Sequence, residues 1–290
     1  MEMVPNEVPQ GAAGKEQKKI PMSPFEILLK NEKVKNRVLV SLEVLFCQAK
    51  VSGEDSEDLV FKIKDIIEEA GSEEDFIFRT RALLDKYKVT EGIENVRGTA
   101  MNAKVDTVKA YLGEKVLDMG AGSGRLSEVI EEKTDSIVTS ADIDDFNETE
   151  RPYVIYDGEK LPLDTDSQDT VLLMMVLHHS EDFEQVLNEA KRVSSGNVVI
   201  GEPVYLDNEM DKQRSLVVDW FIARVLQKSE MAVPGNMKSV LEWEEKFMEL
   251  GFEVEVSEDF CESKINKKDC FEAPVVVERS WLFVLREKQE

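Results

Sequence analysis

The chain has 290 residues, 42% of them hydrophobic, which is enough for one large domain, or for one domain and a smaller one, around a buried core. Its formal net charge of −24 is spread along the chain and repels phosphate backbones and anionic lipid surfaces, so we expect neither nucleic acid nor a membrane as a partner. The apolar runs are too short to span a bilayer, and no membrane helix is expected.

The cysteines, the histidines and the N-terminus indicate the compartment and the metal chemistry. Three cysteines, far apart in the chain, predict neither a disulfide framework nor a zinc site and favour a reducing, cytoplasmic compartment. The two histidines are adjacent, so we expect no multi-histidine site and no bound metal. Residues 1–24 lack the apolar core of a secretory signal and are expected to form a disordered tail.

Residues 25–105 show helical periodicity and predict a subdomain of three or four helices. One segment ends at Gly71 and places an apolar set on one helix face, namely Leu59, Ile63, Ile66, Ile67 and Ala70. We expect this subdomain to lie on the substrate side of the molecule.

From about residue 106 short apolar runs alternate with amphipathic helices, which predicts a parallel, doubly wound sheet with helices on both sides. The expected strands in this part are 115–119, 136–144, 169–177 and 197–203. A helix beginning at Ser239 carries a capping-box pattern with Glu242, and two closing strands are expected at 252–260 and 275–287.

An insertion at about 203–240 interrupts this pattern. Its segment 211–227, "DKQRSLVVDWFIARVLQ", is apolar nearly all round a helix. Such a helix either packs as core against residues 25–100 or covers an apolar ligand as a lid. In the lid interpretation Trp220 lies on the substrate side.

The stretch "VLDMGAGSGRLSEVI" places three glycines at alternate positions between a predicted strand and a helix. They form either a tight turn or a backbone that comes close to a ligand, and the spacing favours nucleotide-type binding. The third glycine is Gly124, and Arg125 stands where the dinucleotide fingerprint requires glycine. Asp118 would repel a pyrophosphate, so we expect a ligand with no phosphates and a positive end.

Four motifs occur in order over residues 112–202: "VLDMGAGSG", "VTSADID", "YDGEKLPLDTDSQDTVLLMMVLHH" and "LNEAKRV". Together they resemble the class I S-adenosylmethionine-dependent methyltransferases, in particular the methyltransferase type 11 branch. The resemblance implies a Rossmann-like methyltransferase fold over residues 106–290, with a doubly wound, mostly parallel seven-stranded sheet. It also implies S-adenosylmethionine as cofactor and S-adenosylhomocysteine as product.

The resemblance further implies which residues contact the cofactor. The amino-acid part would meet Asp118, Gly120, Ala121, Gly122 and Gly124. The ribose hydroxyls would bind Asp142, with Ile143 beside it, and the adenine would lie at Asp157, Gly158 and Glu159. The methionine portion would lie against Met174 and Met175, for which simple core packing is an equal alternative.

The implied reaction is an SN2 transfer of a methyl group to a small, partly apolar molecule through oxygen, nitrogen, sulfur or carbon. His178 and His179 follow the fourth strand and act either as a base or as packing residues of the pocket wall. Glu202 and Tyr205 are further candidates on the substrate side. The alternative is a catalytically inactive fold kept for cofactor binding or interaction. An NAD-dependent oxidoreductase is disfavoured by Arg125.

Overall fold

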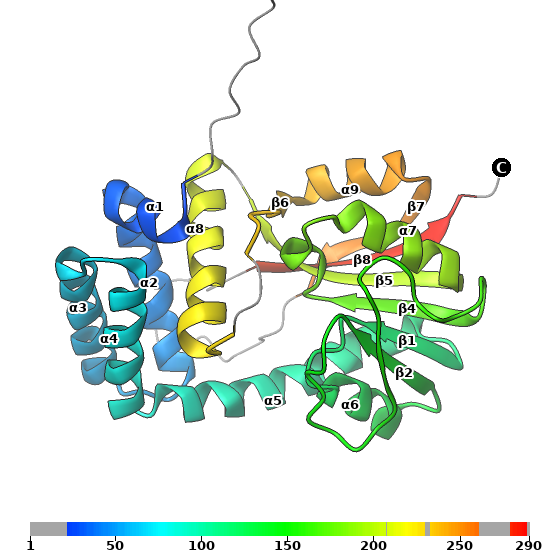
Figure 1. Cartoon of the computed structure of the whole chain (residues 1–290), viewed down its shortest axis with the longest axis horizontal. Coiled ribbons are helices and arrows are strands. Elements are labelled where there is room, and N and C mark those ends of the chain that lie inside the picture. Colours follow the sequence, from blue (N-terminus) through cyan, green and yellow to red (C-terminus); the bar gives the residue numbers. More distant parts are fainter. Residues whose placement is uncertain (1–21, 207, 230–232, 261–278, 289–290) are drawn as a thin grey trace, which may run out of the picture.

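The computed structural model describes residues 22–206, 208–229, 233–260 and 279–288, and within the long helix before the sheet it leaves the side chains of 94–100 undescribed. Most of the expected tail, residues 1–21, lies outside the described residues. Figure 1 shows a group of helices on one side and a sheet with flanking helices on the other.

The helical lobe begins with four helices, each of which starts at a side-chain cap. They are α1 (Pro24–Lys30), α2 (Glu32–Gln48), α3 (Gly53–Glu69) and α4 (Glu73–Lys86). The side chains of Ser23, Asn31, Ser52 and Ser72 accept hydrogen bonds from the first turns of these helices. The buried apolar faces form one core, which includes the predicted Leu59, Ile63, Ile66 and Ile67.

A fifth helix, α5 (Val89–Val108), connects the two lobes and continues into the short 3₁₀ helix η1 (Lys109–Tyr111). Ile93 belongs to the helical core, whereas Val105 and Val108 pack under the sheet. In Figure 1 this helix runs from the helical lobe to α6. The predicted boundary at residue 105 therefore falls inside a continuous helix, and the region holds one helix more than expected.

The sheet is doubly wound and mostly parallel, with the order β3-β2-β1-β4-β5-β8-β7 and a short strand β6 paired to β5. β8 is antiparallel to both β5 and β7. The seven main strands confirm the predicted fold class. Their bounds are β1 (Lys115–Met119), β2 (Ile137–Asp142), β3 (Tyr153–Ile155), β4 (Gln168–Met174), β5 (Ser194–Tyr205), β7 (Phe252–Asp259) and β8 (Arg279–Glu287), with β6 at Lys238–Ser239.

Helices cover both faces of the sheet. One face packs against α7 (Phe183–Val193) and α9 (Val240–Glu249), and the other packs against α5 and α6 (Arg125–Lys133). The capping box that the sequence predicts at Ser239 and Glu242 is present at the start of α9. A 3₁₀ turn, η2 (Leu177–His179), links β4 to the loop before α7.

The insertion after β5 returns to the helical lobe. It forms α8 (Glu209–Trp220), which continues as a π-helix, η3 (Phe221–Leu226). Val217, Val218 and Phe221 share one buried core with the helices of the N-terminal half. The core-packing alternative therefore describes this helix, and Figure 1 shows α8 beside α1 and α2.

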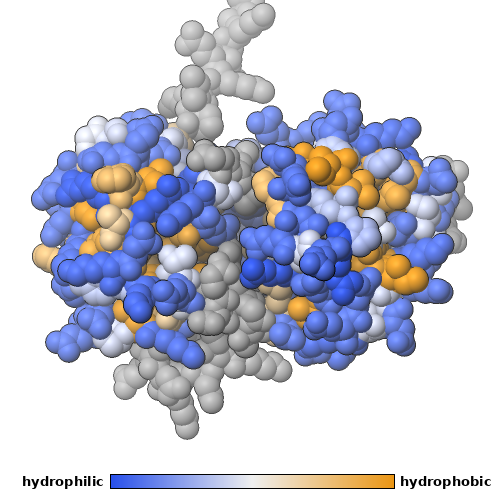
Figure 2. All heavy atoms as spheres, turned by 60° about the horizontal axis from the view of Figure 1, so that its bottom comes forward, coloured by the Kyte–Doolittle hydropathy of each residue, from blue (hydrophilic) through white to orange (hydrophobic). Residues whose placement is uncertain are grey.

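The described surface agrees with the composition. On the face drawn in Figure 2, hydrophilic side chains predominate over both lobes, and the apolar areas between them are smaller. Among the described helices, none combines the length and the apolar character needed to cross a bilayer.

Candidate functional site

The candidate site lies where β1, β2 and β4 end. These strands are parallel, and their register pairs Met119 with Ala141 and Asp118 with Leu172. The glycine loop after β1, Asp142 at the end of β2 and the histidine turn after β4 are therefore brought to one edge of the sheet. This is the edge at which doubly wound folds bind ligands.

The structure explains the three glycines of the loop in different ways. All have positive φ angles, +85° at Gly120, +52° at Gly122 and +75° at Gly124. A Cβ at Gly120 would lie 2.5 Å from Cγ2 of Val176, and one at Gly124 would lie 3.1 Å from Oδ1 of Asn147. A Cβ at Gly122 would meet no other atom within 4 Å. Packing thus accounts for the first and third glycines, while the middle one borders open space.

Asp142 is bonded to the glycine loop. Its Oδ2 accepts a hydrogen bond from the Gly122 N–H at 2.9 Å, and its Oδ1 accepts one from the Ile143 N–H at 2.7 Å. Burial raises the pKa of Asp142, and these two hydrogen bonds oppose the rise. The sequence reasoning missed Tyr153, whose hydroxyl donates to the Gly122 carbonyl at 2.7 Å from the neighbouring strand β3.

Asp118 is buried and points to a partner inside the domain. Its side chain accepts a hydrogen bond from Ser127 Oγ at 2.7 Å, and Ser140 Oγ donates to Ser127 at 2.8 Å. Burial raises the pKa of Asp118 to about 6, against the lowering effect of Ser127. Asp118 is only 1% exposed, and its hydrogen bond with Ser127 holds α6 in place. The resemblance instead implies a direct contact between Asp118 and the cofactor.

The loop expected at the adenine end is present and partly exposed. Oδ1 of Asp157 accepts hydrogen bonds from the N–H groups of Glu159 and Lys160, both at 2.9 Å, and these bonds lower its pKa. A Cβ at Gly158 would lie 3.5 Å from Cγ2 of Ile143. The two segments predicted to flank the adenosine therefore lie next to each other.

The two methionines differ in their surroundings. Met174 is buried against Gly201 of β5, whose missing side chain provides the room for its sulfur and terminal methyl group. Met175 is only partly buried, has a φ of +63°, and its N–H donates to the Gly201 carbonyl at 2.7 Å. Core packing accounts for Met174, while Met175 lies at a strained turn at the site edge.

Glu202 holds the histidine turn in place. It is fully buried and accepts hydrogen bonds from the N–H groups of Val176 at 2.9 Å, Leu177 at 2.8 Å and His178 at 3.3 Å. Its Oε2 also lies 2.6 Å from Nδ1 of His178. Glu202 was expected on the substrate side, and the structure corrects this, because all of its surface is covered.

Two further substrate-side residues are also placed elsewhere. Trp220 is 2% exposed, stacks on Phe76 with ring centroids 5.8 Å apart, and donates from Nε1 to Glu73 at 3.1 Å. It therefore belongs to the helical core and not to an accessible pocket wall. The Tyr205 hydroxyl donates to Glu242 at the start of α9, and burial raises its pKa to about 12. This contact ties Tyr205 to α9.

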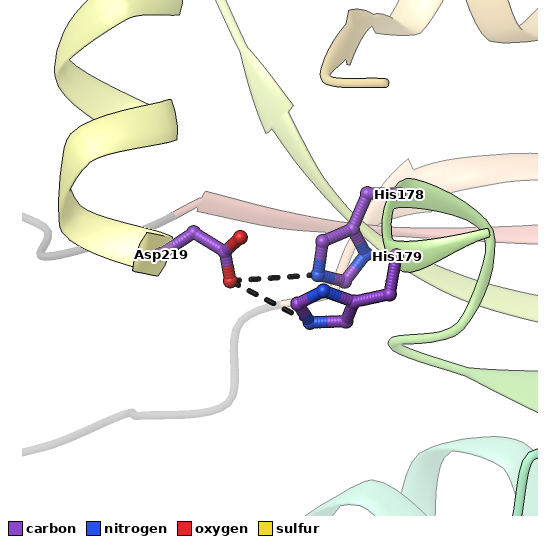
Figure 3. Close-up of side chains that lie close together, drawn as sticks. All are labelled: His178, His179 and Asp219. Carbon is purple, nitrogen blue, oxygen red and sulfur yellow. Dashed lines mark ion pairs between the residues drawn. The ribbon is translucent and has the colours of Figure 1, made fainter. Parts of the chain in front are cut away.

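Both histidines face one carboxylate that the sequence reasoning missed (Figure 3). Oδ1 of Asp219, on α8, lies 3.6 Å from Nε2 of His178 and 3.7 Å from Nε2 of His179. The imidazole rings lie 3.9 Å apart, between centroids. The available signal was a single acid inside the apolar run "LVVDWFI". Asp219 is buried and belongs to the helical lobe, so this cluster joins the two lobes.

The electrostatics of this cluster are dominated by its carboxylates. Burial of the ring opposes protonation of His178, but Glu202 and Asp219 outweigh it and raise the pKa of His178 to about 10. The cluster therefore attracts positive charge.

A hollow of about 470 Å³ lies at the opposite edge of the sheet. Its lining includes Lys109, Gly113 and Asp135, which are near the amino end of β1. None of the predicted site residues belongs to it, so it is separate from the candidate site.

Comparison with known families gives one match. Residues 117–200 match the family model described as a methyltransferase domain. This segment runs from β1 into β5 and contains the glycine loop, Asp142 and the histidine turn. A search of curated proteins found no match to the chain.

Solved structures with similar folds include several methyltransferases. A chain from the complex between the Haloferax volcanii Trm112 methyltransferase activator and a methyltransferase is 18% identical, with a TM-score of 0.47, over 61% of this chain and 84% of its own. The S-adenosylmethionine-dependent methyltransferase from Mesorhizobium loti is 19% identical, with a TM-score of 0.44, over 64% of this chain and 98% of its own.

A third similar structure was solved with ligands. It is the 1,6-didemethyltoxoflavin-N1-methyltransferase of Burkholderia thailandensis with bound 1,6-didemethyltoxoflavin and S-adenosylhomocysteine. It is 16% identical, with a TM-score of 0.46, over 66% of this chain and 79% of its own. At such identities the substrates of these proteins do not transfer to this chain.

The family match covers the segment in which the sequence motifs occur, and the strand order agrees with the fold that those motifs imply. Residues 117–200 therefore match a methyltransferase domain, and they lie within a sheet that has the class I, Rossmann-like strand order.

Proposed function

We propose that this chain is an S-adenosylmethionine-dependent methyltransferase that acts on a small, partly apolar molecule. The open backbone at Gly122 beside Asp142 carries the proposal, since a side chain at this position would fill space that a ligand can occupy. S-adenosylmethionine supplies an electrophilic methyl group on a sulfonium. The protein residues bind and orient the two reactants.

Asp142 has hydrogen-bonding capacity left for two ribose hydroxyls. Each of its oxygens accepts one backbone N–H, at Gly122 and Ile143, and a carboxylate offers about four lone-pair positions. The contacts with the glycine loop can therefore persist while the hydroxyls bind. Asp157 and Gly158, next to Ile143, would receive the adenine.

The acceptor side lies at the histidine turn and α8. His178 and His179 follow β4 at the same edge as the glycine loop, and α8 closes this edge with Asp219. The partly buried His179 offers a polar contact, while Val176 and Met175, also partly buried, offer apolar ones. This mixture fits an acceptor that is small and partly apolar.

Calorimetric binding of S-adenosylhomocysteine to the wild type and to Gly122→Ala tests the proposal. We expect the wild type to bind and Gly122→Ala to lose at least about tenfold in affinity, because the new methyl group enters the open space. Gly251→Ala is the matched control. Gly251 also has a positive φ, +80°, and its nearest neighbour is the end of the flexible Lys191 side chain, outside the site.

Absence of binding to the wild type, or equal binding to Gly122→Ala, would contradict the proposal. Turnover is measured separately, as release of S-adenosylhomocysteine in the presence of a panel of small acceptors. Binding without turnover of any acceptor would favour the alternative of a cofactor-binding module that does not catalyse.

A further inference from the structure

We propose that His178, His179 and Asp219 bind a divalent transition-metal ion of the zinc class, through the two Nε2 atoms and Oδ1 (Figure 3). The three ligand atoms lie within 4.8 Å of one another. Metal binding itself does not depend on the cofactor. The function of the ion, which is to hold the acceptor atom at an open coordination position, rests on the proposed methyl transfer.

The distances between the ligand atoms fit a shared ion. Zinc bonds of about 2.0–2.2 Å in a tetrahedron place two ligand atoms about 3.3–3.6 Å apart. Asp219 Oδ1 lies 3.6 Å from Nε2 of His178 and 3.7 Å from Nε2 of His179. These separations are too long for hydrogen bonds, which span about 2.7–3.2 Å, but movements of a few tenths of an ångström would give the metal geometry.

His178 has a buried nitrogen without a partner. Glu202 accepts three backbone N–H groups and is therefore an ionised acceptor, so we assign Nδ1 of His178 as the donor to it. Nε2 is buried and, among the described residues, has no hydrogen-bond partner, although Oδ1 of Asp219 lies 3.6 Å away. A metal ion would displace the Nε2 proton, and the lone pair set free would bind the ion that Asp219 also ligates.

Two buried carboxylates in the cluster carry a desolvation cost. Glu202 and Asp219 are 0% and 6% exposed, and in the described part of the chain neither is paired with a lysine or an arginine. Glu202 is satisfied by three backbone N–H groups and by His178, whereas the two imidazoles are the charge partners of Asp219 in the described part of the chain. A divalent cation would therefore offset the cost of burying the charge of Asp219. Glu202 then occupies the position of the carboxylate that orients a metal-binding histidine.

The ligand set selects the kind of metal. Two imidazoles and one carboxylate suit zinc and neighbouring transition metals, whereas magnesium and calcium prefer oxygen ligands. Three protein ligands also leave a fourth position open, as in catalytic zinc sites. This inference revises the expectation that adjacent histidines exclude a metal site. The 3₁₀ turn places both rings on the same side, and the third ligand comes from α8, far along the chain.

The test titrates the full-length protein, freed of metal by a chelator and without cofactor, with Co²⁺ and then with Zn²⁺. We expect stoichiometric Co²⁺ binding with visible d–d absorption, displacement by Zn²⁺, and no competition from Mg²⁺. His179→Gln and Asp219→Asn should each weaken binding by about 10–100-fold or more. Glu209→Gln is the matched control, since Glu209 is an exposed acid on the same helix.

Circular dichroism spectra of both variants verify that they fold. Absence of Co²⁺ and Zn²⁺ binding by the wild type would overturn the proposal, as would equal affinity in folded Asp219→Asn and His179→Gln. A thiolate-to-cobalt charge-transfer band would also overturn it, because it would assign the ion to a cysteine. Cofactor binding is measured by calorimetry without metal, so failure of this proposal and failure of the proposed function give different results.

Discussion

At Asp118, burial and hydrogen bonding act in opposite directions on one carboxylate. Its folded-state pKa of about 6 lies above the ordinary value of 3.8, so the folded protein holds the proton more tightly than the unfolded chain does. Below pH 3.8 the carboxyl group is protonated in both the folded and the unfolded state and does not change the free energy of unfolding. As the pH rises from 3.8 to about 6 the free energy of unfolding falls, and above that the full cost of the buried charge is present. The rise corresponds to about 3 kcal/mol, at about 1.4 kcal/mol for each pH unit.

Asp118→Asn should remove this penalty and keep the bond from Ser127, because the amide oxygen still accepts. We expect the variant to be more stable than the wild type by up to about 3 kcal/mol at pH 7.5, and by less than about 1 kcal/mol at pH 4. Urea unfolding at the two pH values measures the difference. Asp145→Asn is an exposed control that should change stability by less than about 0.5 kcal/mol. A pH-independent difference at Asp118 would refute this explanation.

The residue-level predictions from sequence succeeded where a local pattern determines the conformation. The glycine loop was predicted because its positive-φ backbone requires glycine whatever the rest of the fold does. Glu202 and Trp220 were misplaced, since exposure depends on which distant elements cover a residue. Asp219 was missed for the same reason: its partners lie on the other lobe, and no local periodicity indicates them.

At the scale of elements, β1, β2, β4 and β5 followed from runs of apolar residues, whereas β3, which has only three residues, was not among the expected strands. The pairing of β8 between β5 and β7 depends on contacts across the sheet, which the sequence pattern does not specify. The sequence pattern also does not specify which elements α8 packs against. An all-round apolar helix indicates burial, but only the structure shows that it is buried against α1, α2 and α4.

Trp220→Ala tests the role of α8 as a core element. Loss of the stacking on Phe76 and of the buried ring volume should destabilise the protein by about 3–5 kcal/mol, measured by urea unfolding. Leu241→Ala, at a 70% exposed position on α9, should have an effect of less than about 0.5 kcal/mol. The folded variant should retain S-adenosylhomocysteine binding. Unchanged stability combined with a large loss of turnover would instead support a lid.

At the scale of the whole molecule, the two lobes are not consecutive pieces of chain. The helical lobe takes α1–α4 from the N-terminal part and α8 from the insertion after β5. A cut before the sheet therefore does not separate two self-sufficient units, although the change of hydrophobic pattern near residue 106 predicts a domain boundary there.

Removal of residues 1–88 should expose the apolar side of α8 and η3, including Val217, Val218 and Phe221. We expect this truncated chain to aggregate or to bind a hydrophobic dye strongly, because a large apolar patch becomes accessible. Replacing residues 208–229 in the same truncation by a short Gly-Ser linker should restore solubility. A monomeric, cooperatively unfolding truncation that still contains α8 would show that the lobes fold independently.

The cluster in Figure 3 draws its side chains from two separately packed cores, with Asp219 on one and the imidazoles on the other. An ion bound there would link the two cores, and its binding free energy would stabilise their association. Removal of the ion by a chelator would then weaken the association of the two cores without unfolding either of them. A single heat-absorption peak in calorimetry would divide into two as the free ion concentration falls.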